Sequence, residues 1–145
     1  MTLVHATCVA LDRVGVLIRG PSGSGKSDLA LRLIETGAVL VADDQVAVEP
    51  VGGALRASAP GALRGLLEVR GIGIVPMESL DSAPVGLVVD LVPIDAVERL
   101  PEPGAAAAIA GVAIPRLALF AFEAAAPAKV RLAVRLASGN SMAPS

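Results

Sequence analysis

The stretch VGVLIRGPSGSGKSDLALRLIE, residues 14–35, contains three consecutive segments that decide the fold. An apolar, β-branched run at 14–19 predicts a strand, and the apolar residues of 26–37 predict a helix that ends at Gly37. Between them lies a loop of glycine, serine and proline, residues 20–25. A strand, a glycine-rich loop and a helix in this order predict an α/β fold built around a phosphate-binding loop.

The loop follows the pattern G-x-x-x-x-G-K-[ST], in which a lysine and a hydroxyl residue follow the second glycine. Glycines let backbone N–H groups turn toward an anion, and the helix N-terminus adds partial positive charge. The lysine would reach the outer phosphates of a nucleotide, and the hydroxyl would ligate Mg²⁺. A surface loop without a ligand is the competing interpretation. The residues predicted to bind the nucleotide are Gly20, Pro21, Ser22, Gly23, Ser24, Gly25, Lys26 and Ser27.

Two adjacent acids, Asp43 and Asp44, follow the apolar run 38–42, which has the length of a buried strand. P-loop proteins usually present an acid from a neighbouring strand toward the metal. Adjacent side chains of a strand point to opposite faces, so one aspartate could face the metal and the other an incoming hydroxyl, as general base. The residues alone do not decide which is which, and a solvated acidic turn is the alternative.

The remaining segments predict further strands, one terminal helix and no domain boundary. We expect one domain over 1–138 and a disordered tail over 139–145. The expected elements are strands at 3–11, 85–93 and 116–122, a hairpin of 45–50 with 54–58, a strand with a glycine-marked break at 66–76, an irregular segment at 98–111 and a helix at 127–138.

Composition excludes several classes of function. Every apolar run is interrupted well before the roughly 18 residues that a membrane span needs. The net charge is −2, there is no basic block, and the only aromatic residues are Phe120 and Phe122, so we expect no nucleic-acid partner and no membrane. We expect the single cysteine, Cys8, to be a buried core residue. Because there is no second cysteine, no internal disulfide can form, which favours the reducing cytoplasm.

Two stretches, VHATCVALDRVGVLIRGPSGSGKSDLALRLIETGAVLVADDQV (4–46) and LLEVRGIGIV (66–75), resemble the catalytic domain of HPr kinase/phosphorylase. The resemblance is close over roughly the first 76 residues and looser afterwards. The resemblance implies a single P-loop kinase domain, an α/β fold in which helices flank a mixed β-sheet. It implies a cytoplasmic, ATP- and Mg²⁺-dependent enzyme that phosphorylates a serine of the phosphocarrier protein HPr or a paralogue, and can reverse the reaction by phosphorolysis. The chain is similar to short forms that consist of the catalytic domain alone, and the family implies a homo-oligomer, a hexamer.

The resemblance also implies roles for individual residues. Asp44 would take the proton of the acceptor serine, and Ser27 and Glu68 would bind the metal. The residues matching the family's catalytic positions are His5, Lys26, Asp43, Asp44 and, in VERL, Arg99. One departure bears on the reverse reaction: the family segment important for it reads proline-glycine-arginine, whereas Pro115 and Arg116 are adjacent here.

Two other functions fit the same phosphate loop. A small-metabolite kinase would usually add an arginine-rich lid, whereas the segment 101–113 is rich in glycine and alanine. A non-catalytic regulator that senses ATP would need no aspartate base. Because the sequence places neither phenylalanine where it could contact a base, it predicts that nucleotide affinity depends weakly on the base, with less than a hundredfold selectivity.

Overall fold

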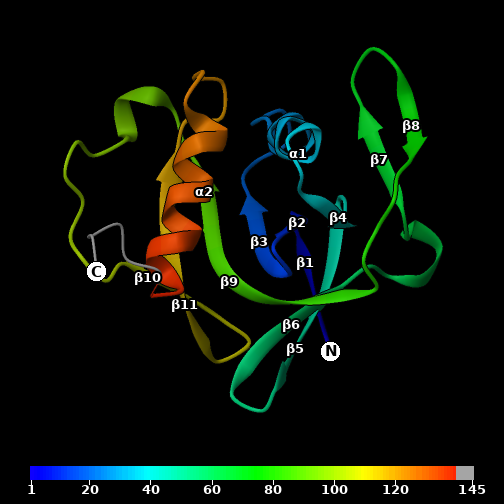
Figure 1. Cartoon of the computed structure of the whole chain (residues 1–145), viewed down its shortest axis with the longest axis horizontal. Coiled ribbons are helices and arrows are strands. Elements are labelled where there is room, and N and C mark those ends of the chain that lie inside the picture. The colour runs from blue at the N-terminus through cyan, green and yellow to red at the C-terminus, as the bar shows by residue number, and fades with distance from the viewer. Residues whose placement is uncertain (140–145) are drawn as a thin grey trace.

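The computed structural model describes residues 1–139, which form a strongly bent β-sheet with two helices on one face (Figure 1). The main sheet has the strand order β1-β5-β6-β9-β3-β2-β4, and β11 and β10 extend it from β9. Its strands are β1 (Thr2–His5), β2 (Thr7–Leu11), β3 (Val14–Arg19), β4 (Val39–Ala42), β5 (Gln45–Val51), β6 (Ala54–Ser58), β9 (Ser82–Leu91), β10 (Ala106–Ile109) and β11 (Val112–Leu119). The other elements are the hairpin β7 (Leu66–Val69) and β8 (Gly73–Pro76), the helices α1 (Lys26–Glu35) and α2 (Ala126–Ala137), and the 3-10 turns η1 (Gly61–Leu63) and η2 (Ile94–Ala96). The predicted α/β class with a mixed sheet is confirmed.

The strands around the phosphate loop end at one edge of the sheet. β3 and β11 both run parallel to β9, and β4 runs parallel to β3 because both are antiparallel to β2. The carboxyl ends of these four strands therefore lie at the same edge, which is where parallel sheets bind ligands. The loop 20–25, the aspartate pair, and the segments after β9 and β11 all start from this edge.

Two apolar clusters fill the two faces of the sheet. The first lies under the helices and includes Leu29 and Leu33 of α1 and Val130 of α2. The second lies on the opposite face, against β5, β6 and β10. Strand β9 contributes to both, because Val89 belongs to the first cluster and Val88 to the second.

Cys8 is fully buried in the second cluster, as the sequence predicted. Burial raises the pKa of its thiol to about 12, against which a hydrogen bond with the backbone of Val16 has only a minor effect. The thiol is therefore protonated and unreactive near neutral pH. Within residues 1–139, no helix is long and apolar enough to cross a membrane.

Two expectations for the strands were wrong. The strand expected at 3–11 is interrupted at Ala6, where the chain leaves β5 as its partner and joins β3 and β4. The alanine run expected to be irregular forms β10, which pairs with β11 across a turn at Ala110 and Gly111. Both turn residues have positive φ, 49° and 80°, which matches the tight turns of hairpins.

The other boundaries shift by a few residues. The strand expected at 116–122 is β11 and ends at Leu119, so both phenylalanines lie in the following loop. The strand expected at 66–76 is the hairpin β7–β8, and the expected hairpin at 45–58 is confirmed as β5–β6. The terminal helix begins at Ala126, with proline in its first turn. The expectation of a disordered tail falls, from residue 140 onward, outside the described residues.

A carboxylate and two arginines connect the parallel strands near their ends. Arg19 of β3 donates to both carboxylate oxygens of Asp90 on β9, at 2.8 and 2.9 Å, and Arg116 of β11 donates to the same carboxylate. Burial raises the pKa of Asp90, but the hydrogen bonds from Arg19 and Arg116 outweigh it and leave the pKa below its usual value.

We expect Leu29→Ala to lower the free energy of unfolding by about 2–5 kcal/mol, because Leu29 is fully buried in the first cluster. Urea unfolding followed by circular dichroism would measure this, since the chain has no tryptophan or tyrosine. Leu100→Ala, at a position 84% exposed, is the control and should change stability by less than about 0.5 kcal/mol. Similar small effects at both positions would contradict the assigned packing.

We expect Asp90→Asn to make the stability of the protein less sensitive to acid. Because the folded pKa of Asp90 is lowered, its stabilising effect is present above the unfolded pKa of about 3.9 and is lost as pH falls through the folded value. The wild type should therefore lose more stability than Asp90→Asn between about pH 5 and pH 3 in urea titrations. Asp95→Asn, at an exposed position on η2, should behave like the wild type.

Candidate active site

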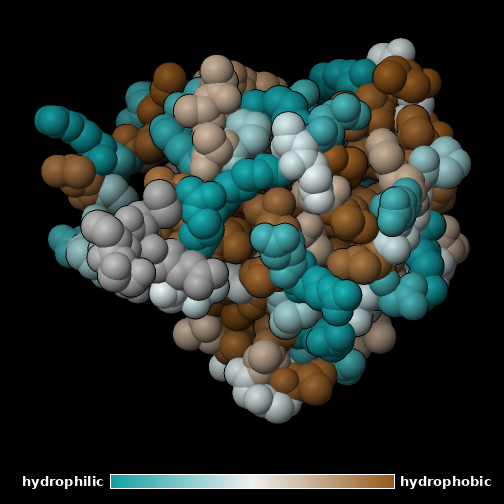
Figure 2. All heavy atoms as spheres, in the orientation of Figure 1, coloured by the Kyte–Doolittle hydropathy of each residue, from teal (hydrophilic) through white to brown (hydrophobic). Residues whose placement is uncertain are grey.

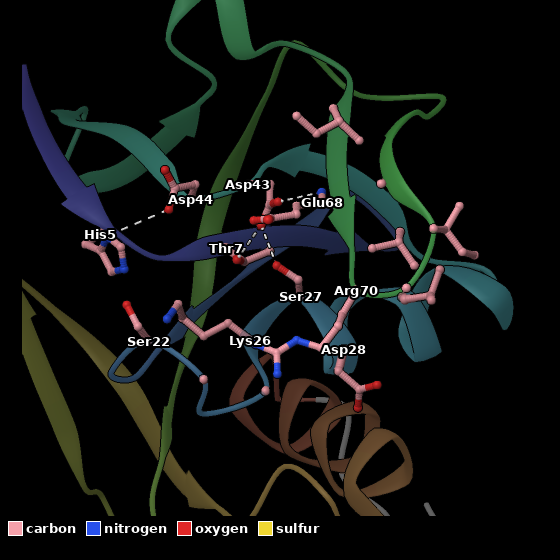
Figure 3. A pocket seen from close by; sticks show the side chains of 18 of the residues that line it. His5, Thr7, Ser22, Lys26, Ser27, Asp28, Asp43, Asp44, Glu68 and Arg70 are labelled. Carbon is pink, nitrogen blue, oxygen red and sulfur yellow. Dashed lines mark hydrogen bonds and ion pairs between the residues drawn. The ribbon is translucent and has the colours of Figure 1, made fainter.

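A cleft of about 710 Å³ lies at the carboxyl edge of the sheet (Figure 3). Its walls come from the amino end of the chain, the phosphate loop and the start of α1, the aspartate pair, the β7–β8 hairpin and the loop after β11. Segments far apart in the sequence thus meet around one space. Of the predicted site residues, the cleft is lined by His5, Ser22, Gly23, Gly25, Lys26, Ser27, Asp43, Asp44 and Glu68.

The loop between β3 and α1 has the conformation that its glycines predict. Gly23 and Gly25 have φ of 80° and 100°, a region that side chains disfavour. Lys26, the first residue of α1, is buried, and its ammonium donates to the carbonyl oxygens of Gly20 at 2.8 Å and Pro21 at 3.2 Å. These bonds hold a positive charge over the loop, next to the helix N-terminus.

Asp43 is buried and accepts three hydrogen bonds. The hydroxyls of Thr7 and Ser27 both donate to its Oδ1 at 2.9 Å, and the backbone N–H of Glu68 donates to its Oδ2 at 3.0 Å. Figure 3 shows the three donors converging on this carboxylate from β2, α1 and β7. One buried charge therefore joins the sheet, the phosphate loop and the hairpin.

Asp44, the next residue, is placed quite differently. Its φ of 70° turns the chain sharply, and its side chain is 68% exposed. The Nδ1 atom of His5 lies 4.0 Å from its Oδ1, across the mouth of the cleft. The two aspartates thus point to different places. The cause is not strand alternation, because both residues lie in the bend after β4 and the left-handed backbone of Asp44 separates them. Asp44 is the one open to an incoming group.

The oxygen donors beside the loop fit Mg²⁺. Ser27 supplies a hydroxyl, and Asp43 and Glu68 supply carboxylates, which are the hard ligands that this ion prefers. Among residues 1–139, no three His, Cys, Asp or Glu side chains form a metal-binding group. Mg²⁺ does not require such a group, because phosphates and water supply most of its ligands.

The structure does not bring Arg99 to the cleft. It lies on the exposed segment between η2 and β10 and is not among the residues that line the cleft. Arg70, in the turn of the β7–β8 hairpin, lines the cleft instead, and its side chain is directed toward the phosphate loop in Figure 3. Within the described part of the chain, no carboxylate forms an ion pair with Arg70.

Two residues near the site were missed from the sequence. Thr7 is a fully buried donor to Asp43. Its place two residues after His5 is the one sequence signal that could have suggested this. Phe122 lines the cleft, a position that the sequence did not indicate for either aromatic residue. The prediction had placed Phe122 inside a strand, and the strand ends three residues earlier.

Comparisons with known proteins agree with this arrangement. The family described as HPr Serine kinase C-terminal domain matches residues 1–134. The HPr kinase/phosphorylase of an Exiguobacterium species is 49% identical over 84 residues, 57% of this chain and 27% of that protein. That of Caldanaerobacter subterraneus is 42% identical over 100 residues, 68% of this chain and 32% of that protein.

A solved structure extends the similarity to the fold. The Hpr(Ser) kinase/phosphatase from Coxiella burnetii superposes with a TM-score of 0.83 at 27% identity, covering 97% of this chain and 92% of that one. The chain spans about a third or less of the length of the curated relatives it matches, 27% and 32% in the two cases above. The residues matched by the family model, 1–134, contain the phosphate loop, both aspartates and the β7–β8 hairpin. The chain therefore belongs to the family of the HPr serine kinase C-terminal domain.

Proposed function

We propose that this chain carries the catalytic site of a serine kinase that transfers the γ-phosphate of Mg·ATP to HPr or a paralogous phosphocarrier. One observation carries the proposal: Asp43 is buried and accepts three hydrogen bonds beside the phosphate loop, whereas Asp44 is exposed next to His5. A site with one aspartate for the metal shell and a second for a hydroxyl suits phosphoryl transfer. The names of the relatives support the choice of carrier.

In this proposal the loop residues bind the triphosphate through backbone N–H groups, and Lys26 contacts its outer phosphates. Ser27 and Glu68 would hold Mg²⁺, with Asp43 orienting the Ser27 hydroxyl. When bound, the ion would neutralise charge on the phosphates. The binding energy comes mainly from charge-assisted hydrogen bonds to phosphate oxygens.

The acceptor serine would approach Asp44, whose carboxylate takes the hydroxyl proton as the oxygen attacks the γ-phosphorus. His5, 4.0 Å away, would orient this carboxylate. We propose Arg70 as the cation that neutralises the transferring phosphoryl group, because its side chain is directed toward the phosphate loop. The corresponding role of Arg99 stays a prediction without support from its position.

The rim of the cleft suits a protein acceptor. Ile72 and Ile74 of the β7–β8 hairpin are 77% and 70% exposed and line the cleft. Figure 2 shows hydrophobic surface gathered at the upper right, over this hairpin. A protein carrying the acceptor serine could cover these side chains, whereas a small metabolite would leave most of their surface in water.

The same proposal includes action in the cytoplasm and assembly into a homo-oligomer, which the family resemblance implies. In this proposal, phosphorolysis is slower than transfer to the carrier. Pro115 and Arg116 lie within β11, and the Arg116 guanidinium is held by Asp90. Because the segment is strand rather than loop, we expect the reverse reaction with inorganic phosphate to be slower than forward transfer.

Intact mass spectrometry of HPr-type carriers incubated with the protein and Mg·ATP should show one added phosphate on a serine. Lys26→Ala should abolish the transfer, because the loop loses its charge for the outer phosphates. Arg135→Ala, on the outer part of α2, is the matched control and should leave transfer unchanged. Nucleotide binding without transfer to any carrier would favour the regulator that senses ATP, and transfer to a metabolite alone would favour the small-molecule kinase.

The two aspartates should respond differently to the same change. Asp44→Asn should reduce the transfer rate by roughly 10²–10⁴-fold while leaving the melting temperature and ATP affinity near the wild-type values. Asparagine tolerates the left-handed backbone at this position, so the fold should not be disturbed.

Asp43→Asn should instead lower the melting temperature and weaken Mg·ATP binding, because an amide cannot accept all three hydrogen bonds. Circular dichroism melts and calorimetric titration of both variants would measure the difference. Equal rates for Asp44→Asn and the wild type would rule out Asp44 as the base.

A further inference from the structure

A second cavity, of about 270 Å³, lies beside the phosphate loop on its β9 and β11 side. Asp43 stands on the opposite side of the loop, because β2 and β4 are the neighbours of β3 in that direction. The cavity is bounded by Pro21 and Ser22 of the loop, by Pro93 after β9, and by Phe120 and Phe122 after β11. It therefore adjoins the proposed triphosphate site but is not used by the phosphates, the metal or the acceptor.

The two phenylalanines, the only aromatic residues of the chain, meet at this cavity. Their rings pack edge to face, with centroids 5.7 Å apart and planes at 74°. Phe122 lines both the cleft and the second cavity, and its side chain is 55% exposed. Its ring also lies against the loop, since a Cβ on Gly25 would sit 2.8 Å from the Phe122 Cζ.

The loop that carries Phe122 is fastened to α1. The guanidinium of Arg32 donates to the carbonyl oxygens of Ala121 and Glu123, the residues on either side of Phe122. Asp28 holds the same guanidinium at 3.0 Å. Because α1 begins at Lys26, these contacts fix the ring relative to the phosphate loop.

We propose that this cavity binds the nucleobase of the bound nucleoside triphosphate, with the base stacked on Phe122. The inference rests on the proposed function, in which the adjoining cleft binds the triphosphate. Ligands of parallel sheets bind across the carboxyl ends of neighbouring strands, and the loops after β9 and β11 supply this cavity. A concave site with a fixed, half-exposed aromatic ring is suited to a planar, weakly polar group.

The lining also defines which bases should bind. Its side chains are apolar apart from the hydroxyls of Ser22 and Ser24, so stacking rather than a pattern of hydrogen bonds distinguishes the bases. Purines, with the larger flat surface, should bind more tightly than pyrimidines. Adenine and guanine should differ by only a few fold, which keeps the selectivity below a hundredfold while giving the base a definite contribution to affinity.

Calorimetric titration with two probes separates the base from the phosphates. Mg·ATP carries both, whereas Mg·tripolyphosphate carries only the phosphates. In Phe122→Ala the dissociation constant for Mg·ATP should rise by roughly 5- to 150-fold, the range of one lost base–aromatic stack, while that for Mg·tripolyphosphate changes by less than about twofold. Leu136→Ala on α2, at a position with the same exposed fraction of 55%, is the control and should change neither.

Phe122→Leu keeps an apolar contact with Gly25 and removes the flat ring, so it should lose ATP affinity selectively even if Phe122→Ala fails to fold. Unchanged ATP affinity in a folded variant would overturn the inference. Equal weakening for both probes would also overturn it, because the ring would then only support the loop. Wild-type protein that binds tripolyphosphate as tightly as ATP would refute the base site alone, whereas binding of neither probe would refute the proposed function as well.

Discussion

The buried carboxylate of Asp43 is the interaction on which the site depends. It accepts hydrogen bonds from Thr7, Ser27 and the backbone of Glu68, so β2, the start of α1 and β7 are held at fixed distances by one group. Hydrogen bonds to a charged acceptor in a dry environment are strong, and an unmatched charge there would be costly. The position of the Ser27 hydroxyl, which we propose to bind the metal, and the position of the hairpin are therefore set together.

This arrangement places the next residue, Asp44, in a different environment from Asp43. Asp43 turns inward and accepts three hydrogen bonds, while the left-handed backbone at Asp44 turns its own carboxylate out to the mouth of the cleft. A rigidly held carboxylate beside the phosphate loop and an accessible one, the proposed base, are thus adjacent in the sequence without sharing hydrogen-bond donors. The exposed rim formed by Ile72 and Ile74 leaves that mouth open to a large partner.

The sequence predicted best those features that are encoded locally. The strand, loop and helix of 14–35 were predicted correctly because their signals, the glycines and the spacing of apolar residues, act between residues that are close in the sequence. The hairpin at Gly52 and Gly53 was predicted correctly for the same reason. The alanine strand β10 was missed because its stability comes from β11 and not from its own residues. Arg70 could not be ranked above Arg99, and Phe122 could not be placed near the loop, because both depend on contacts between distant segments.

Strand β9 has a consequence for how the molecule unfolds. The first part of this ten-residue strand pairs with β6, and the later part pairs with β3 and β11. Its side chains enter both apolar clusters, so neither cluster can open while the other keeps its packing. The two halves should therefore melt in a single cooperative transition, and amide protons of β9 should be among the last to exchange with solvent.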